Sequence, residues 1–66
     1  MTHRIYEFFG ATSGKVSRGD FSNSDAALAQ INERSKFVFA EEDADHPGFW
    51  DVYADGRLFT IEPVAA

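Results

Sequence analysis

The stretch AEEDADHPGFW, residues 40–50, holds the densest group of chemically capable side chains in this chain. Four carboxylates and one histidine are clustered there: Glu41, Glu42, Asp43, Asp45 and His46. Such groups can ligate a metal ion, act as general acid and base, or form a charged surface for a cationic partner. The choice among these chemistries depends on the rest of the chain and on the elements that position the stretch.

A metal site is the first alternative. Residues 43–48, DADHPG, approach the start of a calcium loop, D-x-D-x-[DN]-G, with the glycine in place. Pro47, however, stands where a third oxygen ligand belongs, and Ala54 occupies the position of the bidentate glutamate. The chain has no cysteine, which excludes disulfides and thiolate metal sites. We therefore predict no metal and no cofactor.

Catalysis is the second alternative. His46 beside Asp45 is a candidate acid or base, but a few groups on one loop lack the preorganised surroundings that catalysis needs. GATSGK, residues 10–15, is one residue shorter than a phosphate-binding loop, and Val16 replaces its Ser or Thr. No set of nucleophile, base and orienting group is visible, and 66 residues leave little volume for a pocket. We predict that the protein is not an enzyme and has no catalytic residues.

The charge of the chain favours the third alternative. The net charge is −5, and it is unevenly distributed. Residues 1–36 hold four acids and five bases, whereas residues 37–66 hold seven acids and one base. Nucleic-acid binding depends on basic charge against phosphate, so direct binding is disfavoured and a basic protein partner is favoured. The competing interpretation is that the acidity only keeps a small domain soluble.

The first half of the chain predicts a hairpin and a helix. Aromatic and β-branched residues indicate strands at about 3–9 and 15–21, joined by the GATSG turn, and Gly19 weakens the second strand or marks a bulge. In residues 22–35 the apolar period becomes helical, with Ser22 or Ser24 as the N-cap. A helix of about ten residues is unstable alone, so its stripe of Leu28 and Ile31 must pack on a sheet.

The second half predicts three strands. KFVFA, residues 36–40, is nearly all apolar and indicates an interior strand. Asp55-Gly56 predicts a type I′ hairpin turn, which pairs Ala54 with Arg57 and sets the register of both strands. One face of that hairpin is a core face, formed by Trp50, Val52, Phe59 and Ile61. The other face is acidic and aromatic, and Pro63 is expected to end the last strand.

These elements predict a single α+β domain over residues 1–66, in the order β-β-α-β-β-β. We expect an antiparallel sheet of four or five strands with one helix packed on one face. Tyr6, Phe8 and Phe9 are expected in the core. No apolar run approaches the length of a membrane span, and the N-terminus lacks the apolar stretch of a signal peptide, so we expect a cytoplasmic protein without a membrane partner.

The function favoured by these observations is a small acidic interaction protein that binds a basic protein partner. The predicted partner-binding residues are the loop acids with the outer face of the last hairpin: Glu41, Glu42, Asp43, Asp45, Asp51, Tyr53, Asp55 and Glu62. A narrower hypothesis makes the protein a nucleic-acid mimic, because carboxylates two residues apart on an extended segment, such as Asp43 and Asp45, have about the spacing of successive phosphates. Phage-encoded inhibitors, including anti-CRISPR and anti-restriction proteins, are similar in size and charge alone.

Two other classes stay open at this point. Basic and aromatic residues of the first half suggest a platform for single-stranded nucleic acid: Arg4, Lys15, Arg18 and Lys36 with Tyr6 and Phe8. An exposed edge strand suggests a structural subunit, or a homo-oligomer formed by edge-to-edge pairing.

Overall fold

A computed structural model describes residues 2–10 and 14–64 of the chain. These residues form the predicted order of elements: β1 (Thr2–Phe8), β2 (Lys15–Phe21), α2 (Ser24–Glu33), β3 (Val38–Glu42), β4 (Trp50–Ala54) and β5 (Arg57–Val64). The α+β class is confirmed. The predicted GATSG turn falls mostly on residues 11–13, which lie outside the described residues.

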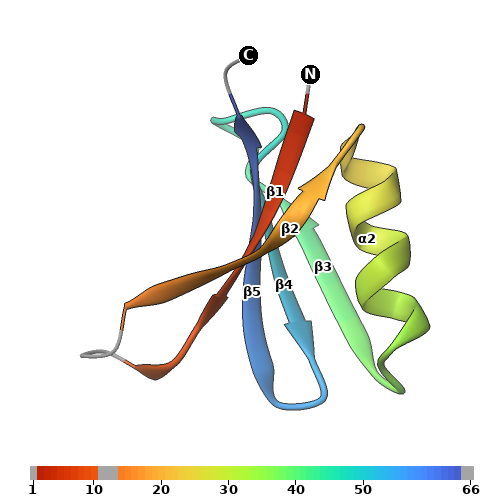
Figure 1. The fold of residues 1–66 in the computed structure, drawn as a ribbon. Helices are drawn as coiled ribbons and strands as arrows, with labels where there is room; N and C mark the ends of the chain where they lie inside the picture. The colour runs from red at the N-terminus through yellow and green to blue at the C-terminus, as the bar shows by residue number, and fades with distance from the viewer. Residues whose placement is uncertain (1, 11–13, 65–66) are drawn as a thin grey trace.

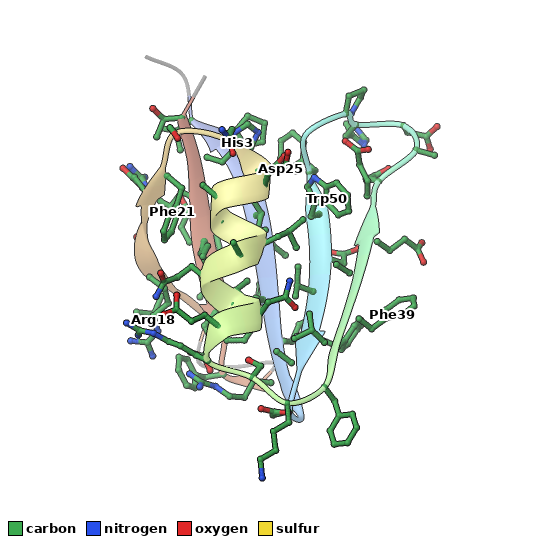
Figure 2. The ribbon with its side chains drawn as sticks, turned by 90° about the vertical axis from the view of Figure 1, so that its right-hand side faces the viewer. His3, Arg18, Phe21, Asp25, Phe39 and Trp50 are labelled. Carbon is green, nitrogen blue, oxygen red and sulfur yellow. The ribbon has the colours of Figure 1, made fainter. Side chains whose placement is uncertain are left out.

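The sheet is antiparallel throughout, in the order β2-β1-β5-β4-β3. The helix α2 lies across one face of the sheet, and the other face is left open (Figure 1). The helix packs against β1, β2 and β5, so that β4 and β3 extend beyond it on one side (Figure 2). The consequence is an open sheet face with two exposed edges, β2 and β3.

The core lies between α2 and the sheet. It is built from small, branched and aromatic residues: Ile5, Ala27, Ile31, Val52, Ala54, Phe59 and Ile61. Docking of α2 through Ile31 is confirmed, although Leu28 is only half-buried and Ala27 is fully buried in its place. The N-cap is Asn23 rather than Ser22 or Ser24, because the Asn23 side chain accepts a hydrogen bond from the Ala26 N–H at 2.8 Å.

The β4–β5 hairpin has the predicted register, from Trp50 opposite Ile61 to Ala54 opposite Arg57. Both central turn residues have positive φ, with 50° at Asp55 and 80° at Gly56, which is the requirement of a type I′ turn. Gly19 lies at the predicted bulge, where the β1–β2 register shifts and φ reaches 114°.

Replacing Gly56 tests this turn. No atom beyond its chain neighbours lies within 4 Å of where a Cβ would stand, so only backbone strain opposes a side chain. We expect Gly56→Val to lower the free energy of unfolding by more than about 1 kcal/mol, because β-branched residues strongly disfavour positive φ. Gly56→Asn is the matched control, since Asn tolerates this region. Equal urea midpoints for both variants would contradict the turn geometry.

The apolar run KFVFA was predicted to be an interior strand, and this is wrong. Its strand, β3, is an edge strand that pairs with β4 alone. Val38 and Ala40 pack against the core, whereas Phe39 is 60% exposed and the preceding Phe37 is 80% exposed. An apolar run shows that its side chains are hydrophobic, but it does not determine the position of the strand in the sheet. That position depends on the pairing of strands that are distant in the sequence.

The expected packing of Tyr6, Phe8 and Phe9 in the core is also wrong, and Phe9 is 44% exposed. Alternation along β1 turns Ile5 and Glu7 toward α2, and it leaves Tyr6 and Phe8 half-buried on the open face. Pro63 does not end β5, which continues to Val64. Past Ile61 the strand has β1 as its neighbour and no longer β4, a position at a sheet edge where proline is tolerated.

Candidate functional site

The candidate site lies on the open face of the sheet, where β3 and β4 run side by side. Glu41 stands directly opposite Asp51, and Phe39 stands directly opposite Tyr53. All four side chains are exposed, because the alternate residues Val38 and Ala40 turn toward the core. Figure 2 shows Phe39 projecting from β3 away from α2. Two exposed acids and two exposed aromatic rings are thus brought together. We call these four residues the β3–β4 patch.

Electrostatically, the patch is unfavourable to its own fold. Carboxylates directly opposite each other on neighbouring strands repel and destabilise the pair. Within residues 2–10 and 14–64, neither Glu41 nor Asp51 forms an ion pair that would relieve this repulsion. Phe39 and Tyr53 also remain in water, at 60% and 55% exposure. The patch therefore presents unpaired negative charge and exposed aromatic surface that do not stabilise the fold.

Two of the other predicted site acids, Asp55 and Glu42, have structural contacts near the patch. The Asp55 carboxylate accepts hydrogen bonds from the N–H groups of Phe37 and Lys36, at 2.9 and 3.0 Å. These two N–H donors hold the pKa of Asp55 below its usual value. Glu42 accepts from the Gly48 N–H at 3.0 Å and closes the loop between β3 and β4. Both acids thus shape the chain around the patch.

Asp43 organises the same loop. Its carboxylate accepts from the Asp45 N–H at 2.9 Å and contacts His46 Nδ1 at 3.1 Å. The Asp45 N–H, and then His46, lower the pKa of Asp43. The segment from Asp43 to Asp45 is therefore a turn, and the extended spacing suggested for a phosphate-like pair is not present there.

The remaining predicted acids are separate from the patch. Asp45 is exposed at the loop. Glu62 lies on the open face of β5, where it accepts from Lys15 Nζ at 3.1 Å and from the Thr60 hydroxyl at 2.9 Å. Of the eight predicted residues, the structure brings Glu41, Asp51 and Tyr53 together. Phe39 was not among the predicted residues. It could have been predicted only if the antiparallel pairing of β3 with β4 had been known, since this pairing places it opposite Tyr53.

The basic residues of the first hairpin are largely paired. Arg4 donates from Nε and Nη2 to Asp20, at 2.6 and 3.1 Å, and Lys15 pairs with Glu62 and lies over the Tyr6 ring. Arg18 is on the opposite, helix-facing side, where it donates to Glu7. A stacking platform for single strands would need these cations free and on one face. In this hairpin each of the three cations has an acidic partner, and they lie on both faces of the sheet.

Glu7 was not predicted from the sequence as a residue of interest, and it is 2% exposed beneath α2. Arg57 donates to it from Nε at 2.6 Å and from Nη2, and Arg18 donates from Nε at 3.1 Å. The hydrogen bonds from Arg57 lower the pKa of Glu7, desolvation opposes them, and Arg18 lowers the pKa further. Its signal in the sequence is weak, because an acid between Tyr6 and Phe8 resembles a solvent-facing residue.

Comparison with known proteins yields no relative. No protein-family model, no curated protein and no solved structure matches the chain significantly. Among the described residues, no group of three or more metal-ligating side chains is close enough to hold an ion. The helix α2 has ten residues, and no helix within residues 2–10 and 14–64 is long and apolar enough to cross a bilayer.

Proposed function

We propose that this protein is a non-enzymatic interaction protein that binds a basic protein partner through the β3–β4 patch. The observation that supports it most is the direct pairing of Glu41 with Asp51 beside the exposed pair of Phe39 and Tyr53. Interfaces favour aromatic anchors, and complementary charge around such anchors accelerates and orients binding. A Lys or Arg of the partner, placed between the two carboxylates, would relieve their repulsion.

The charge distribution supports a cationic partner rather than an anionic one. The half of the sequence that supplies β3, β4 and β5 carries seven acids and one base. The patch therefore lies in a negative field that attracts a basic surface from a distance of about one Debye length, near 8–10 Å. Phe39 and Tyr53 then supply the short-range contact area that electrostatic attraction alone lacks.

A narrower proposal concerns the kind of partner. A surface of Lys and Arg that binds phosphates also attracts carboxylates, and a protein that covers such a surface would act as an inhibitor. Glu41 and Asp51 carry this proposal, since Asp43 and Asp45 lie in a turn. We expect duplex DNA or RNA to compete with this protein for the captured partner. If the partner binds nucleic acid and this protein at the same time, the inhibitor proposal is wrong, whereas the proposal of an interaction protein still stands.

The test of the proposal is a double variant, Glu41→Gln with Asp51→Asn. We expect its thermal midpoint to be unchanged or slightly raised, because a like-charge pair is removed. We expect the same variant to bind the partner with a lower association rate and a shallower salt dependence. The measurements are thermal melting, and surface plasmon resonance at several salt concentrations against the basic protein captured from a lysate.

The matched control is Asp25→Asn with Glu33→Gln. It changes the net charge by the same amount, but both residues are exposed on α2. The control distinguishes an effect of the charges at the β3–β4 patch from a general effect of net charge. If both double variants bind equally well, the acids only solubilise the protein. If the patch variant melts far below the wild type, Glu41 and Asp51 are structural and the proposal fails.

A further inference from the structure

A pocket of about 230 Å3 lies on the other side of the sheet, between α2 and strands β1, β2 and β5. Its charged lining consists of three arginines and one buried carboxylate: Arg18, Arg34, Arg57 and Glu7. Figure 2 shows Arg18 beside the C-terminal half of α2. The lining thus carries two more positive than negative charges, in a protein whose net charge is −5.

Each guanidinium in this pocket is held in a fixed orientation. Arg57 is bonded to Glu7 through Nε and Nη2, and its guanidinium carbon lies 5.2 Å from the centre of the Phe59 ring. Arg18 is bonded to Glu7 through Nε, and its guanidinium carbon lies 5.4 Å from the centre of the Phe9 ring. One carboxylate and two rings therefore position both side chains.

The third arginine belongs to the C-terminal end of α2. Arg34 is the C-cap residue, and its Nε and Nη2 donate to the Gln30 side-chain oxygen at 2.9 and 3.1 Å when the amide is oriented to satisfy both groups. Each of the three arginines thus uses its Nε in an internal contact. Among the contacts of the described residues, the Nη1 atoms of Arg18, Arg34 and Arg57 remain available.

Stability alone does not account for this arrangement. A buried ion pair contributes little more than well-packed apolar residues would, because both charges must be desolvated. Both carboxylate oxygens of Glu7 accept hydrogen bonds from the two arginines, whereas the side chains of Arg18 and Arg57 remain 44% and 58% exposed. A buried carboxylate that orients two guanidinium groups is the kind of support that a binding site for an oxyanion requires.

We propose that this pocket binds the phosphate group of a small molecule that carries an apolar body. A phosphate monoester brings about two negative charges, which match the excess of two positive charges in the lining. Among the apolar lining residues, half-buried Phe21 offers surface for the remainder of the ligand, whereas Ile5, Ile31 and Phe59 are at most 7% exposed. The proposal is independent of the β3–β4 patch, which lies on the opposite face of the sheet.

Phenyl phosphate is the probe for this site, with inorganic phosphate and benzoate for comparison. The measurement is a titration of the 15N-labelled protein, followed by NMR at constant ionic strength, in which the Nε–H signals of the arginines are resolved. We expect saturable shifts at Arg18, Arg34 and Arg57, and none at Tyr53 of the β3–β4 patch. Phenyl phosphate should bind more tightly than inorganic phosphate, because it also covers apolar surface.

Two variants locate the effect. Arg34→Gln is expected to weaken phenyl phosphate binding by about tenfold or more, since a charge-assisted contact is lost. Arg4→Gln removes the same charge from the open face and should leave the affinity unchanged. A spectrum with native dispersion shows that each variant is folded. Arg18→Lys keeps the charge, loses the planar fork, and should also weaken binding.

Three results would overturn the proposal. The first is an absence of saturable shifts with phenyl phosphate, and the second is an equal loss of affinity in Arg34→Gln and Arg4→Gln. The third is tighter binding of benzoate than of phenyl phosphate, which would exclude the phosphate group as the preferred ligand. None of these outcomes affects the proposed partner binding, which is measured with other variants.

Discussion

Replacing Ile31 with alanine is expected to lower the free energy of unfolding by about 2–5 kcal/mol. Ile31 is 6% exposed and packs α2 against the sheet, together with Ala27. A domain of this size has a total stability of only about 5–15 kcal/mol, and it has few other large residues to hold the helix. The loss of three carbon atoms from this interface therefore removes a large share of the stability. Urea denaturation followed by circular dichroism measures it.

Graded substitutions make the Ile31 result specific. Ile31→Val removes one carbon and is expected to cost about 0.5–1.5 kcal/mol. Leu28→Ala should cost less than Ile31→Ala, because Leu28 is only half-buried. A Leu28 variant that is less stable than the Ile31 variant would mean that α2 docks through a different stripe. No change in either variant would place the core elsewhere.

Replacing Glu7 with glutamine is the second change with a large expected effect, a loss of about 1.5–3 kcal/mol at pH 7. Glutamine has nearly the same shape, but it lacks the charge and places an amide NH2 among guanidinium N–H donors. The carboxylate is 2% exposed, so water replaces little of what is lost. Denaturation in urea at pH 7 measures the difference from the wild type.

The pH dependence of this difference identifies its cause. Arg57 and Arg18 hold the pKa of Glu7 below its ordinary value of 4.5 in the folded protein. The carboxylate therefore contributes its stability in full above about pH 4.5, and this contribution is lost as the pH falls through the lowered folded pKa. Wild type and Glu7→Gln should thus converge in acid. A difference that stays constant down to pH 2–3 would assign the loss to packing.

Much of the fold could be predicted because it depends on neighbours in the sequence. The turn at Asp55-Gly56 follows from which residues tolerate positive φ, and a two-residue turn determines the register of β4 with β5. The helix α2 follows from apolar spacing and polar residues before it. The bulge at Gly19 has the same local origin. In each case the physical cause acts over a few residues.

About half of the candidate site could be anticipated in this way. Asp51 and Tyr53 share a face because strand residues alternate, and the hairpin register shows which face it is. The neighbouring pair, Glu41 and Phe39, joins them only because β3 pairs with β4. The sequence could not show which acids have structural contacts and which are unpaired. Asp55, for example, accepts hydrogen bonds from the N–H groups of Lys36 and Phe37, which are distant in the sequence.

The tertiary structure alone decided which strands lie at the edges and what surrounds Glu7. The apolar strand β3 is an edge strand because β5 pairs with β1 on one side and β4 on the other, a choice made between segments up to 62 residues apart. Glu7 is buried because the same pairing brings Arg57 to it, 50 residues along the chain. Composition and periodicity indicate which side chains of a segment are buried or exposed. Sheet order and ion pairing depend on contacts between segments that are distant in the sequence.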